Sequence, residues 1–224
     1  MKRLAKIIIA IYYQIRYWRK CKLHVFSSTI INNCSFEGKN IIGRSTYLNH
    51  TIVGFGSYIG MYGEFTNCTI GKFCSIGNNV RVVSATHPTN MVSTHPAFYS
   101  DSYPLSFVEE SKFCEHLTTA NNNECEIGND VWIGDNVLLK GGIKVGDGAI
   151  IGMGSIVLHD VEPYSIIAGV PAHLIRKRFS DILISELLKT KWWDFPLSWL
   201  RTNADIFINP ELLLEELKHR VTSV

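Results

Sequence analysis

The sequence predicts an all-β solenoid, in which short strands wind into a triangular coil, and one repeating pattern carries this prediction. Aliphatic residues recur every six positions in the second half of the chain, at Ile127, Ile133, Leu139, Val145, Ile151 and Val157. Glycine directly follows several of them, at Gly128, Gly134, Gly146 and Gly152. A strict short period marks a repeat architecture, because each unit can bury its apolar face only by stacking on its neighbours.

The same period appears earlier in the chain. The earlier runs are Ile30, Phe36, Ile42 and Leu48, then Val53, Ile59 and Phe65, then Ile70, Ile76 and Val82. The register slips by one residue between runs, which we interpret as a small irregularity at a turn. Six extended residues span about 20 Å, so an inward aliphatic residue followed by a small one gives a flat strand and a bend. An ordinary sandwich would show a period of two along each strand instead.

Composition fits a single elongated domain with end pieces and narrows its function. The 224 residues are 46% hydrophobic and carry a formal net charge of +2, so charge gives no reason to expect nucleic-acid binding. The six cysteines show no Cys-x-x-Cys spacing. They predict free thiols in a reducing compartment, and we expect a cytoplasmic protein.

Residues 1–26 predict a basic amphipathic helix. Its apolar face comprises Leu4, Ile7, Ile8, Ile11, Ile15 and Trp18, and its basic face comprises Lys2, Lys6, Arg16 and Lys20. The apolar run Ile7–Tyr13 is too short to cross a bilayer, and no small-residue cleavage site follows it. We expect the helix to cap the open end of the solenoid, or to lie on the inner membrane face through residues 2–20.

The segment over about residues 83–126 lacks the repeat and predicts a loop that leaves the solenoid. It holds three prolines and three consecutive asparagines, and long insertions of this kind often carry function. It opens with Ser84-Ala85-Thr86-His87-Pro88. This string resembles the catalytic loop of sugar O-acetyltransferases of the hexapeptide-repeat family, in which the histidine is the general base.

Other segments resemble the same acyltransferase family, and in particular its xenobiotic branch, which includes the type B chloramphenicol acetyltransferases. These segments are Ile70-Gly-Lys-Phe-Cys-Ser-Ile-Gly77, Ile127-Gly-Asn-Asp-Val-Trp-Ile-Gly134, Gly146–Gly152 through Ala168–Ala172, and Lys191-Trp-Trp-Asp-Phe-Pro196. The resemblance covers about residues 30–200. It implies a left-handed parallel β-helix over 27–178, a helical tail over 179–224 and a homotrimer. It also implies acetyl-CoA as co-substrate, and we expect no metal.

His87 is the candidate catalytic base, because histidine can accept a hydroxyl proton and later protonate a leaving thiolate. The resemblance places the oxyanion donor at the backbone N–H of Gly134 or Asp135. His95 is a rival base, and His116 lies in the same loop. For both, a structural role in the loop is the favoured interpretation.

The group that orients His87 stays open at this stage. Glu115, Glu124 and Glu126 lie in the appropriate part of the sequence. A backbone carbonyl is the alternative, as in the xenobiotic branch.

The resemblance implies that coenzyme A binds along the groove between neighbouring β-helices. Pantetheine would run beside Trp132, Gly134, Gly152 and Met153. The adenosine phosphates would meet the residues at the family's phosphate-binding positions, which here are His159, His173, Arg176 and Lys177. Trp132 could equally be a structural plug between subunits, and the basic residues could equally form a solvated helix start.

The sequence says least about which molecule accepts the acetyl group. The loop around His87 favours O-acetylation of a saccharide from a capsule, O-antigen or related glycan. The tail favours the xenobiotic alternative, with chloramphenicol or a streptogramin as acceptor. Two other classes stay open: a metal enzyme of the γ-carbonic anhydrase type, which would need three converging histidines, and a β-helix scaffold without catalysis.

Overall fold

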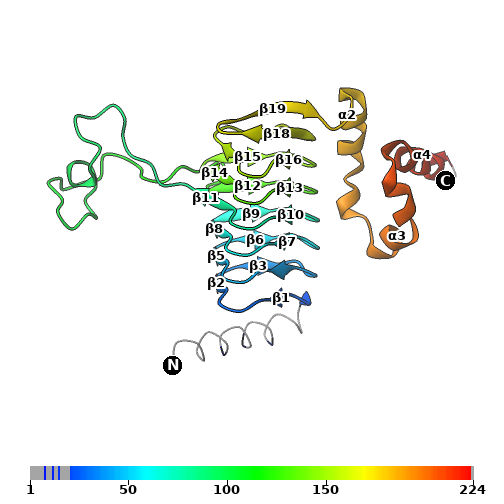
Figure 1. Cartoon of the computed structure of the whole chain (residues 1–224), viewed down its shortest axis with the longest axis horizontal. Coiled ribbons are helices and arrows are strands. Elements are labelled where there is room, and N and C mark those ends of the chain that lie inside the picture. The colour runs from blue at the N-terminus through cyan, green and yellow to red at the C-terminus, as the bar shows by residue number, and fades with distance from the viewer. Residues whose placement is uncertain (1–7, 9–11, 13–14, 16–20, 223–224) are drawn as a thin grey trace.

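The chain forms a triangular parallel β-helix with a long loop on one side and a helical tail on the other (Figure 1). The computed structural model describes residues 8, 12, 15 and 21–222, with side chains described as far as residue 218. Strand partners in the early coils lie 17 residues apart, as Ile41 and Tyr58 do. Each coil therefore contributes one short strand to each of three sheets, as a hexapeptide period requires.

The first sheet has eight strands and forms one whole face of the coil. Its members are β1 (His24–Val25), β4 (Ile41–Ile42), β7 (Tyr58–Ile59), β10 (Ser75–Ile76), β13 (Trp132–Ile133), β16 (Ile150–Ile151), β18 (Ser165–Gly169) and β19 (Ala172–Lys177). All neighbours pair in parallel except β18 and β19, which form an antiparallel hairpin at the end of the coil.

The second and third sheets complete the triangle. The second contains β2 (Ile30–Asn32), β5 (Tyr47–Asn49), β8 (Glu64–Thr66), β11 (Arg81–Val83), β14 (Leu138–Lys140) and β17 (Ile156–Val157). The third contains β3 (Ser35–Phe36), β6 (Ile52–Val53), β9 (Cys68–Ile70), β12 (Cys125–Ile127) and β15 (Ile143–Val145).

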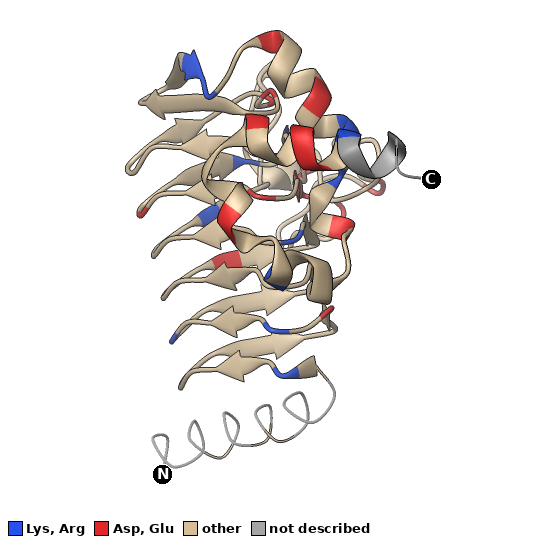
Figure 2. Ribbon diagram, turned by 90° about the vertical axis from the view of Figure 1, so that its right-hand side faces the viewer, with Lys and Arg blue, Asp and Glu red and all other residues tan. Residues whose placement is uncertain are grey.

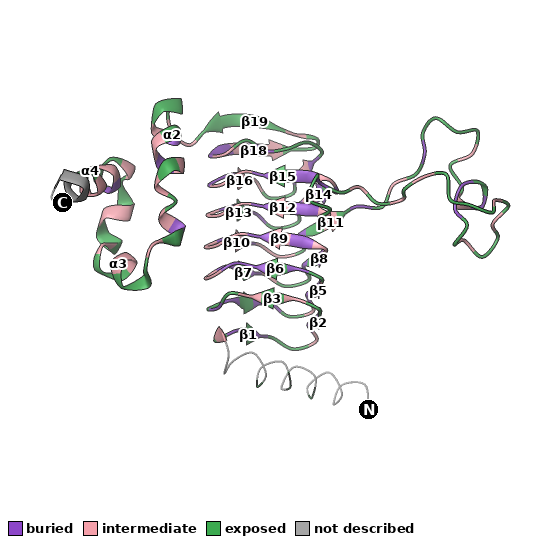
Figure 3. Ribbon diagram, turned by 180° about the vertical axis from the view of Figure 1, so that it is seen from behind, coloured by how far each residue is buried: buried purple, intermediate pink, exposed green. Residues whose placement is uncertain are grey.

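The core is the inside of this coil, and the six-residue period identifies most of it. All six aliphatic residues of the later run, from Ile127 to Val157, are buried. One earlier assignment is wrong: Ile30 is 49% exposed, whereas Ile31 is buried and pairs with Leu48 of the next coil. Successive residues of a strand point to opposite faces, so a shift of one position reverses the direction of the side chain. Figure 3 shows buried segments recurring in the stacked strands.

The corners of the coil use left-handed backbone conformations at equivalent positions. Asn79 and Asn136 have φ angles of 55° and 60°, which asparagine adopts more readily than most residues. Their side chains are also joined, since Nδ2 of Asn79 donates to Oδ1 of Asn136 at 3.0 Å. A corner that repeats in this way keeps the coils in register.

The expected loop leaves the body between β11 and β12 (Figure 1). Its one regular element in the description is a short 3-10 helix, η1 (Pro96–Phe98). Most of its side chains are exposed, including Phe98 and Phe107, whose rings lie 5.2 Å apart. Tyr99 is an exception and is fully buried.

The helical tail follows β19 and packs against the body. It consists of α2 (Asp181–Thr190), η2 (Trp192–Asp194), α3 (Leu197–Thr202), η3 (Ala204–Ile208) and α4 (Pro210–Thr222). The ring of Trp192 lies 5.4 Å from that of Phe73, and Nζ of Lys72 lies 2.8 Å from Oδ1 of Asp194. Several acidic positions lie along this tail (Figure 2).

The expected N-terminal helix, with its capping or membrane role, falls mostly outside the described residues. Ile8, Tyr12 and Ile15 are helical and exposed. The helix does not extend to residue 26, because His24 and Val25 already form β1. Within the described residues, no helix combines the length and apolar character that crossing a membrane requires.

Candidate active site

His87 lies at the base of the loop, where the two arms of the loop run antiparallel. The N–H of Thr86 donates to the carbonyl of Glu115 at 2.8 Å, and the N–H of Leu117 donates to the carbonyl of Ser84 at 2.9 Å. These bonds join residues from the two ends of a long insertion. They bring Glu115 beside the segment that carries His87, although neither residue belongs to a regular strand.

One ring nitrogen of His87 is anchored and the other is left open. Nδ1 lies 3.0 Å from the carbonyl oxygen of Thr94 and 2.7 Å from the hydroxyl oxygen of Tyr99. A carbonyl can only accept, so these partners assign the proton of the neutral ring to Nδ1 and the lone pair to Nε2. No partner of Nε2 is found in the described part of the chain. A general base needs this tautomer.

Tyr99 supports His87 from inside the loop. Its ring is fully buried and lies edge-on to Phe113, with the ring centroids 5.6 Å apart. Burial raises the pKa of Tyr99, and the carboxylate of Glu115 raises it further through its charge and a hydrogen bond. The phenol therefore stays protonated at neutral pH and can donate that proton to Glu115.

Two of the carboxylates considered from the sequence have different roles. Glu115 reaches His87 through Tyr99, whereas Glu126 accepts hydrogen bonds from Thr119 and Asn121. Burial opposes ionisation of Glu126, but the bond from Thr119 and the Lys144 ammonium together lower its pKa. Glu126 is thus an ionised group that fastens the end of the loop to the body.

A cavity of about 210 Å³ opens beside His87. Most of its lining residues have hydrogen-bonding side chains, which besides His87 are Thr86, Ser100, Ser102, Tyr103, Glu115 and His116. Such a lining offers hydroxyl and carboxylate partners to a small molecule that carries several hydroxyl groups.

The two other loop histidines have structural contacts of their own. Nδ1 of His95 accepts from the N–H of Ala97 at 3.2 Å and caps η1, and its ring lies edge-on to Tyr103. Nδ1 of His116 lies 3.3 Å from Oγ of Ser84. His87 is therefore the stronger candidate base.

A second and larger cavity lies on the first sheet, away from His87. It is a groove of about 790 Å³. Its lining includes five residues expected at the coenzyme and acetyl sites: Trp132, Gly134, Asp135, Gly152 and Met153. The side chains of Trp132 and Met153 are 55% and 81% exposed. Large apolar side chains left this open on the surface are available to a ligand or to another chain.

The two candidate oxyanion donors in the groove differ in their backbone hydrogen bonds. The N–H of Gly134 donates to the carbonyl of Ile151 at 2.8 Å and is committed to the strand ladder. At preceding coils, the N–H of Met61 donates to Oδ1 of Asn78, and that of Asn78 to Oδ1 of Asp135, both at 2.8 Å.

At the next coil the acceptor is missing. Met153 stands where an acceptor would be needed, and among the described residues the N–H of Asp135 has no partner. Asp135, rather than Gly134, therefore presents a free donor in the groove.

The four expected phosphate-binding residues do not line this groove. His173 comes nearest, because it pairs with the groove residue Ala168 in the β18–β19 hairpin. Arg176 uses Nη1 to bond the carbonyl of Lys177, and Lys177 pairs with Asp181. The turn after β17 carries His159, which is exposed. Their assignment to coenzyme phosphates stays a prediction.

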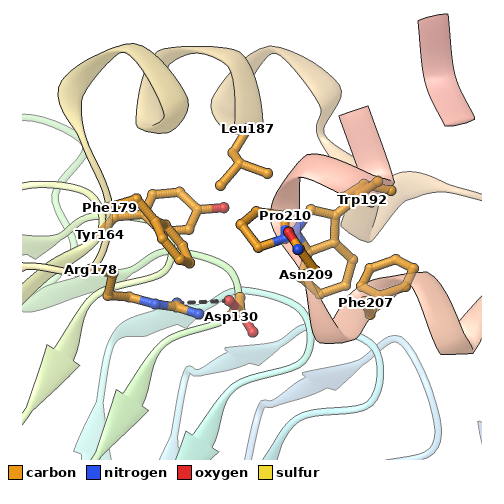
Figure 4. A pocket seen from close by; sticks show the side chains of 10 residues that line it. Asp130, Tyr164, Arg178, Phe179, Leu187, Trp192, Phe207, Asn209 and Pro210 are labelled. Atoms are coloured by element: carbon orange, nitrogen blue, oxygen red, sulfur yellow. Dashed lines mark hydrogen bonds and ion pairs between the residues drawn. The ribbon is translucent and has the colours of Figure 1, made fainter. Parts of the chain in front are cut away.

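Arg178, by contrast, is partly buried and held by several contacts. Figure 4 shows its guanidinium group directed at Asp130, in a cavity of about 280 Å³ under the helical tail. Nη1 lies 3.0 Å from Oδ2 of Asp130 and 2.7 Å from the carbonyl of Gly148, and the group stacks on Tyr164 at 5.1 Å. Burial raises the pKa of Asp130, and Arg178 opposes that effect. This ion pair fastens the tail to the coil.

No metal centre is evident within the described residues, where no three His, Cys, Asp or Glu side chains come together as ligands. His87, His95 and His116 have the separate partners given above. The geometry within one chain thus offers no support for the carbonic-anhydrase alternative.

The comparisons with known proteins agree with this fold. Residues 124–159 match the model of the bacterial transferase hexapeptide (six repeats). A chloramphenicol acetyltransferase from Escherichia coli is 42% identical over 186 residues, which cover 74% of this chain and 85% of that protein. The chain belongs to the bacterial hexapeptide-repeat transferase family. The sequence-based expectation of an acyltransferase is thus confirmed at the level of the family.

One further sequence relative and one solved structure show how far the similarity extends along this hexapeptide-repeat transferase. A chloramphenicol acetyltransferase from Morganella morganii is 43% identical over 136 residues, and the chain spans only 62% of the length of that protein. A hexapeptide-repeat acetyltransferase from Vibrio cholerae, solved in complex with acetyl coenzyme A, superposes with a TM-score of 0.53. It is 20% identical, and the match covers 67% of this chain and 73% of that one. This likeness confirms the left-handed β-helix.

Proposed function

We propose that this protein is an acetyl-CoA-dependent O-acetyltransferase in which His87 is the general base. The observation that carries the proposal is the anchoring of Nδ1 by Thr94 and Tyr99, which leaves the Nε2 lone pair open beside a cavity. An alcohol is a weak nucleophile at neutral pH. A positioned base of this kind contributes about 10²–10⁴-fold in rate.

The chemical step follows from these two nitrogens. Nε2 of His87 takes the proton of the acceptor hydroxyl as its oxygen attacks the thioester carbonyl and forms the new C–O bond. The tetrahedral intermediate then collapses, the C–S bond breaks, and the same proton passes from Nε2 to the coenzyme thiolate. The ring begins and ends the cycle neutral, with Nδ1–H still bonded to Thr94.

The coenzyme fits the groove on the first sheet. An extended pantetheine arm would lie across the exposed faces of Trp132 and Met153, and the N–H of Asp135 would stabilise the developing oxyanion. The hairpin that extends this sheet beyond Ala168 carries His173, Arg176 and Lys177, which we propose as partners of the nucleotide phosphates.

A complete site on this proposal needs two chains. His87 and the groove residues line separate cavities of a single chain, and the loop projects away from the body (Figure 1). We therefore propose a homotrimer, in which the loop of one subunit meets the groove of a neighbour.

For the acceptor, we favour a small hydroxylated antibiotic of the chloramphenicol type. The support is the identity of more than 40% to chloramphenicol acetyltransferases, and this replaces the preference for a saccharide drawn from the loop motif. A saccharide stays the second candidate because of one observation: the cavity beside His87 is lined mainly by hydrogen-bonding side chains.

The test is acetyl-CoA-dependent thiol release by the purified protein, with chloramphenicol, a streptogramin and a panel of oligosaccharides as acceptors. Turnover of the antibiotics alone would support the first candidate, and turnover of a glycan alone would support the second. If no acceptor is turned over and coenzyme A fails to raise the melting temperature, the enzyme proposal is wrong. A ligand that binds only the folded state must stabilise it.

A further inference from the structure

The loop places a carboxylate behind the candidate base without direct contact between the two groups. Tyr99 links them: its hydroxyl oxygen lies 2.7 Å from Nδ1 of His87, and the Glu115 side chain acts on the same phenol and raises its pKa. The sequence does not suggest this arrangement, because Tyr99 follows His87 within the loop and Glu115 comes from the returning arm.

The directions of these hydrogen bonds are fixed by their chemistry. Nδ1–H faces two acceptors, the Thr94 carbonyl and the Tyr99 hydroxyl oxygen, since a lone pair on Nδ1 would oppose the carbonyl. The proton of Tyr99 is then available to Glu115, the carboxylate that acts on this phenol. The arrangement allows a chain from Nδ1–H to the phenol and from the phenol to a carboxylate.

We propose that Tyr99 and Glu115 are positioning residues, which stabilise the imidazolium form of His87 while the proton of the acceptor is held on Nε2. This inference rests on the proposed function and names the residues that support its base. Neither residue touches the reacting atoms in this role. A carboxylate polarises the phenol, and the polarised phenol oxygen accepts more strongly from a charged ring than from a neutral one.

The surroundings of Tyr99 support a fixed role rather than a chance contact. The side chain is fully buried within a loop whose side chains are mostly exposed. Its ring packs on Phe113, and its carbonyl accepts from the N–H of Lys112 at 2.8 Å. The pairing of Glu115 with Thr86 sets the other end of the chain of bonds.

A rival explanation is that Glu115 contacts the acceptor directly, because it also lines the cavity beside His87. The two roles predict different kinetics. A positioning role changes kcat, whereas an acceptor contact made equally in ground and transition states changes KM. They also differ in whether the effect of Glu115 depends on Tyr99.

The experiment is a double-mutant cycle in the full-length protein, with Glu115→Gln, Tyr99→Phe and the combination. Glu110→Gln is the matched control, because Glu110 lies in the same loop and its side chain is 84% exposed. Circular dichroism and coenzyme A binding would verify that each variant folds. We expect each single variant to lower kcat by about 10–100-fold, with little change in the acceptor KM and no effect of the control.

The double variant is the decisive comparison. If the residues act as one chain, the combined change costs no more than either single change. In Glu115→Gln the acidic limb of the rate profile should also move to lower pH, because an amide stabilises a charged ring less than a carboxylate does. Tyr103 and His116 also line the cavity and stay unchanged in all variants.

Two results would overturn the inference. One is a Glu115→Gln effect that persists fully in the Tyr99→Phe background, and the other is a change confined to KM. Either would leave the assignment of His87 intact. Retention of activity by His87→Ala would instead overturn the proposed function itself.

Discussion

The corner of the body and the extruded loop each present one polar group for chemistry, and they do so by opposite means. At the corner, side-chain oxygens of Asn78 and Asp135 satisfy the backbone N–H groups of the preceding coils. Where Met153 takes that position, the series stops, and the N–H of Asp135 has no acceptor among the residues that the structure describes. In the loop nothing repeats, and Thr94 and Tyr99 fix His87 individually.

The comparison shows that the buried core of the coil supplies most of the stability, whereas the loop holds the candidate base. The coil buries an aliphatic residue in nearly every strand, so each residue is supported by the coils on both sides of it. The loop buries few side chains and depends on single hydrogen bonds. Changes in the buried core of the coil should therefore affect unfolding, and changes around His87 in the loop should affect turnover.

The largest expected effect on stability comes from the core of the coil. Leu139 is fully buried, so Leu139→Ala should lower the free energy of unfolding by about 2–5 kcal/mol through lost burial and the cavity left behind. Leu105 of the loop is 59% exposed, and Leu105→Ala should change the free energy of unfolding by less than about 0.5 kcal/mol. Denaturant unfolding measures both, and equal losses would contradict the division between coil and loop.

A substitution at Met153 can give the N–H of Asp135 a hydrogen-bond acceptor. In Met153→Asn, the new amide oxygen should accept from the N–H of Asp135 as Asn78 accepts from Met61. Removal of an oxyanion donor costs about 10²–10³-fold in kcat, so turnover should fall while the melting temperature holds or rises. Met153→Leu keeps the apolar contact without an acceptor and is the control. A similar loss in both variants would remove Asp135 from the mechanism.

The attachment of the tail should contribute much less. Lys72 pairs with Asp194, and its side chain is 28% exposed, so Lys72→Met should cost about 0.2–1 kcal/mol as a partly exposed ion pair. Lys189→Met breaks the more exposed pair with Glu186 within α2 and serves as the comparison. Intrinsic tryptophan fluorescence during urea unfolding would report both. A larger loss from Lys189 would contradict the role of Lys72.

The smallest effect concerns pH. Hydrogen bonds from the backbone and side chain of Asn78 lower the pKa of Asp135. Because the unfolded value is about 3.9, the carboxylate stabilises the fold above that pH and loses this contribution as pH falls through the lower folded pKa. The stability difference between wild type and Asp135→Asn should therefore shrink on acidification below about pH 4. Urea midpoints measured across this range would contradict the account if the difference stayed constant.

The sequence could predict most of the coil because the same buried position recurs every six residues. Every aliphatic residue of the later run is buried as expected. The error at Ile30 arose at the start of the coil, where three residues of β2 offer two adjacent isoleucines and the pattern has no earlier coil to set its register. The end of the expected N-terminal helix was also misplaced, because β1 already begins at His24.

The site was predictable only in part. His87 follows from a motif at the start of the loop, and the groove residues follow from the resemblance of their coils to the hexapeptide-repeat family. The commitment of Gly134 to the ladder and the freedom of Asp135 depend on which side chain stands one coil further on. Tyr99 and Glu115 depend on how an irregular loop folds back on itself, and no spacing in the sequence encodes that.

The central claim is that Nε2 of His87 removes the acceptor proton. The direct measurement is turnover of His87→Ala with and without added imidazole, on whichever acceptor the wild type accepts. The account predicts a loss of about 10²–10⁴-fold, partial recovery with imidazole, and an unchanged melting temperature. Full activity without imidazole would contradict the claim, and the base would then have to be sought at His95 or His116.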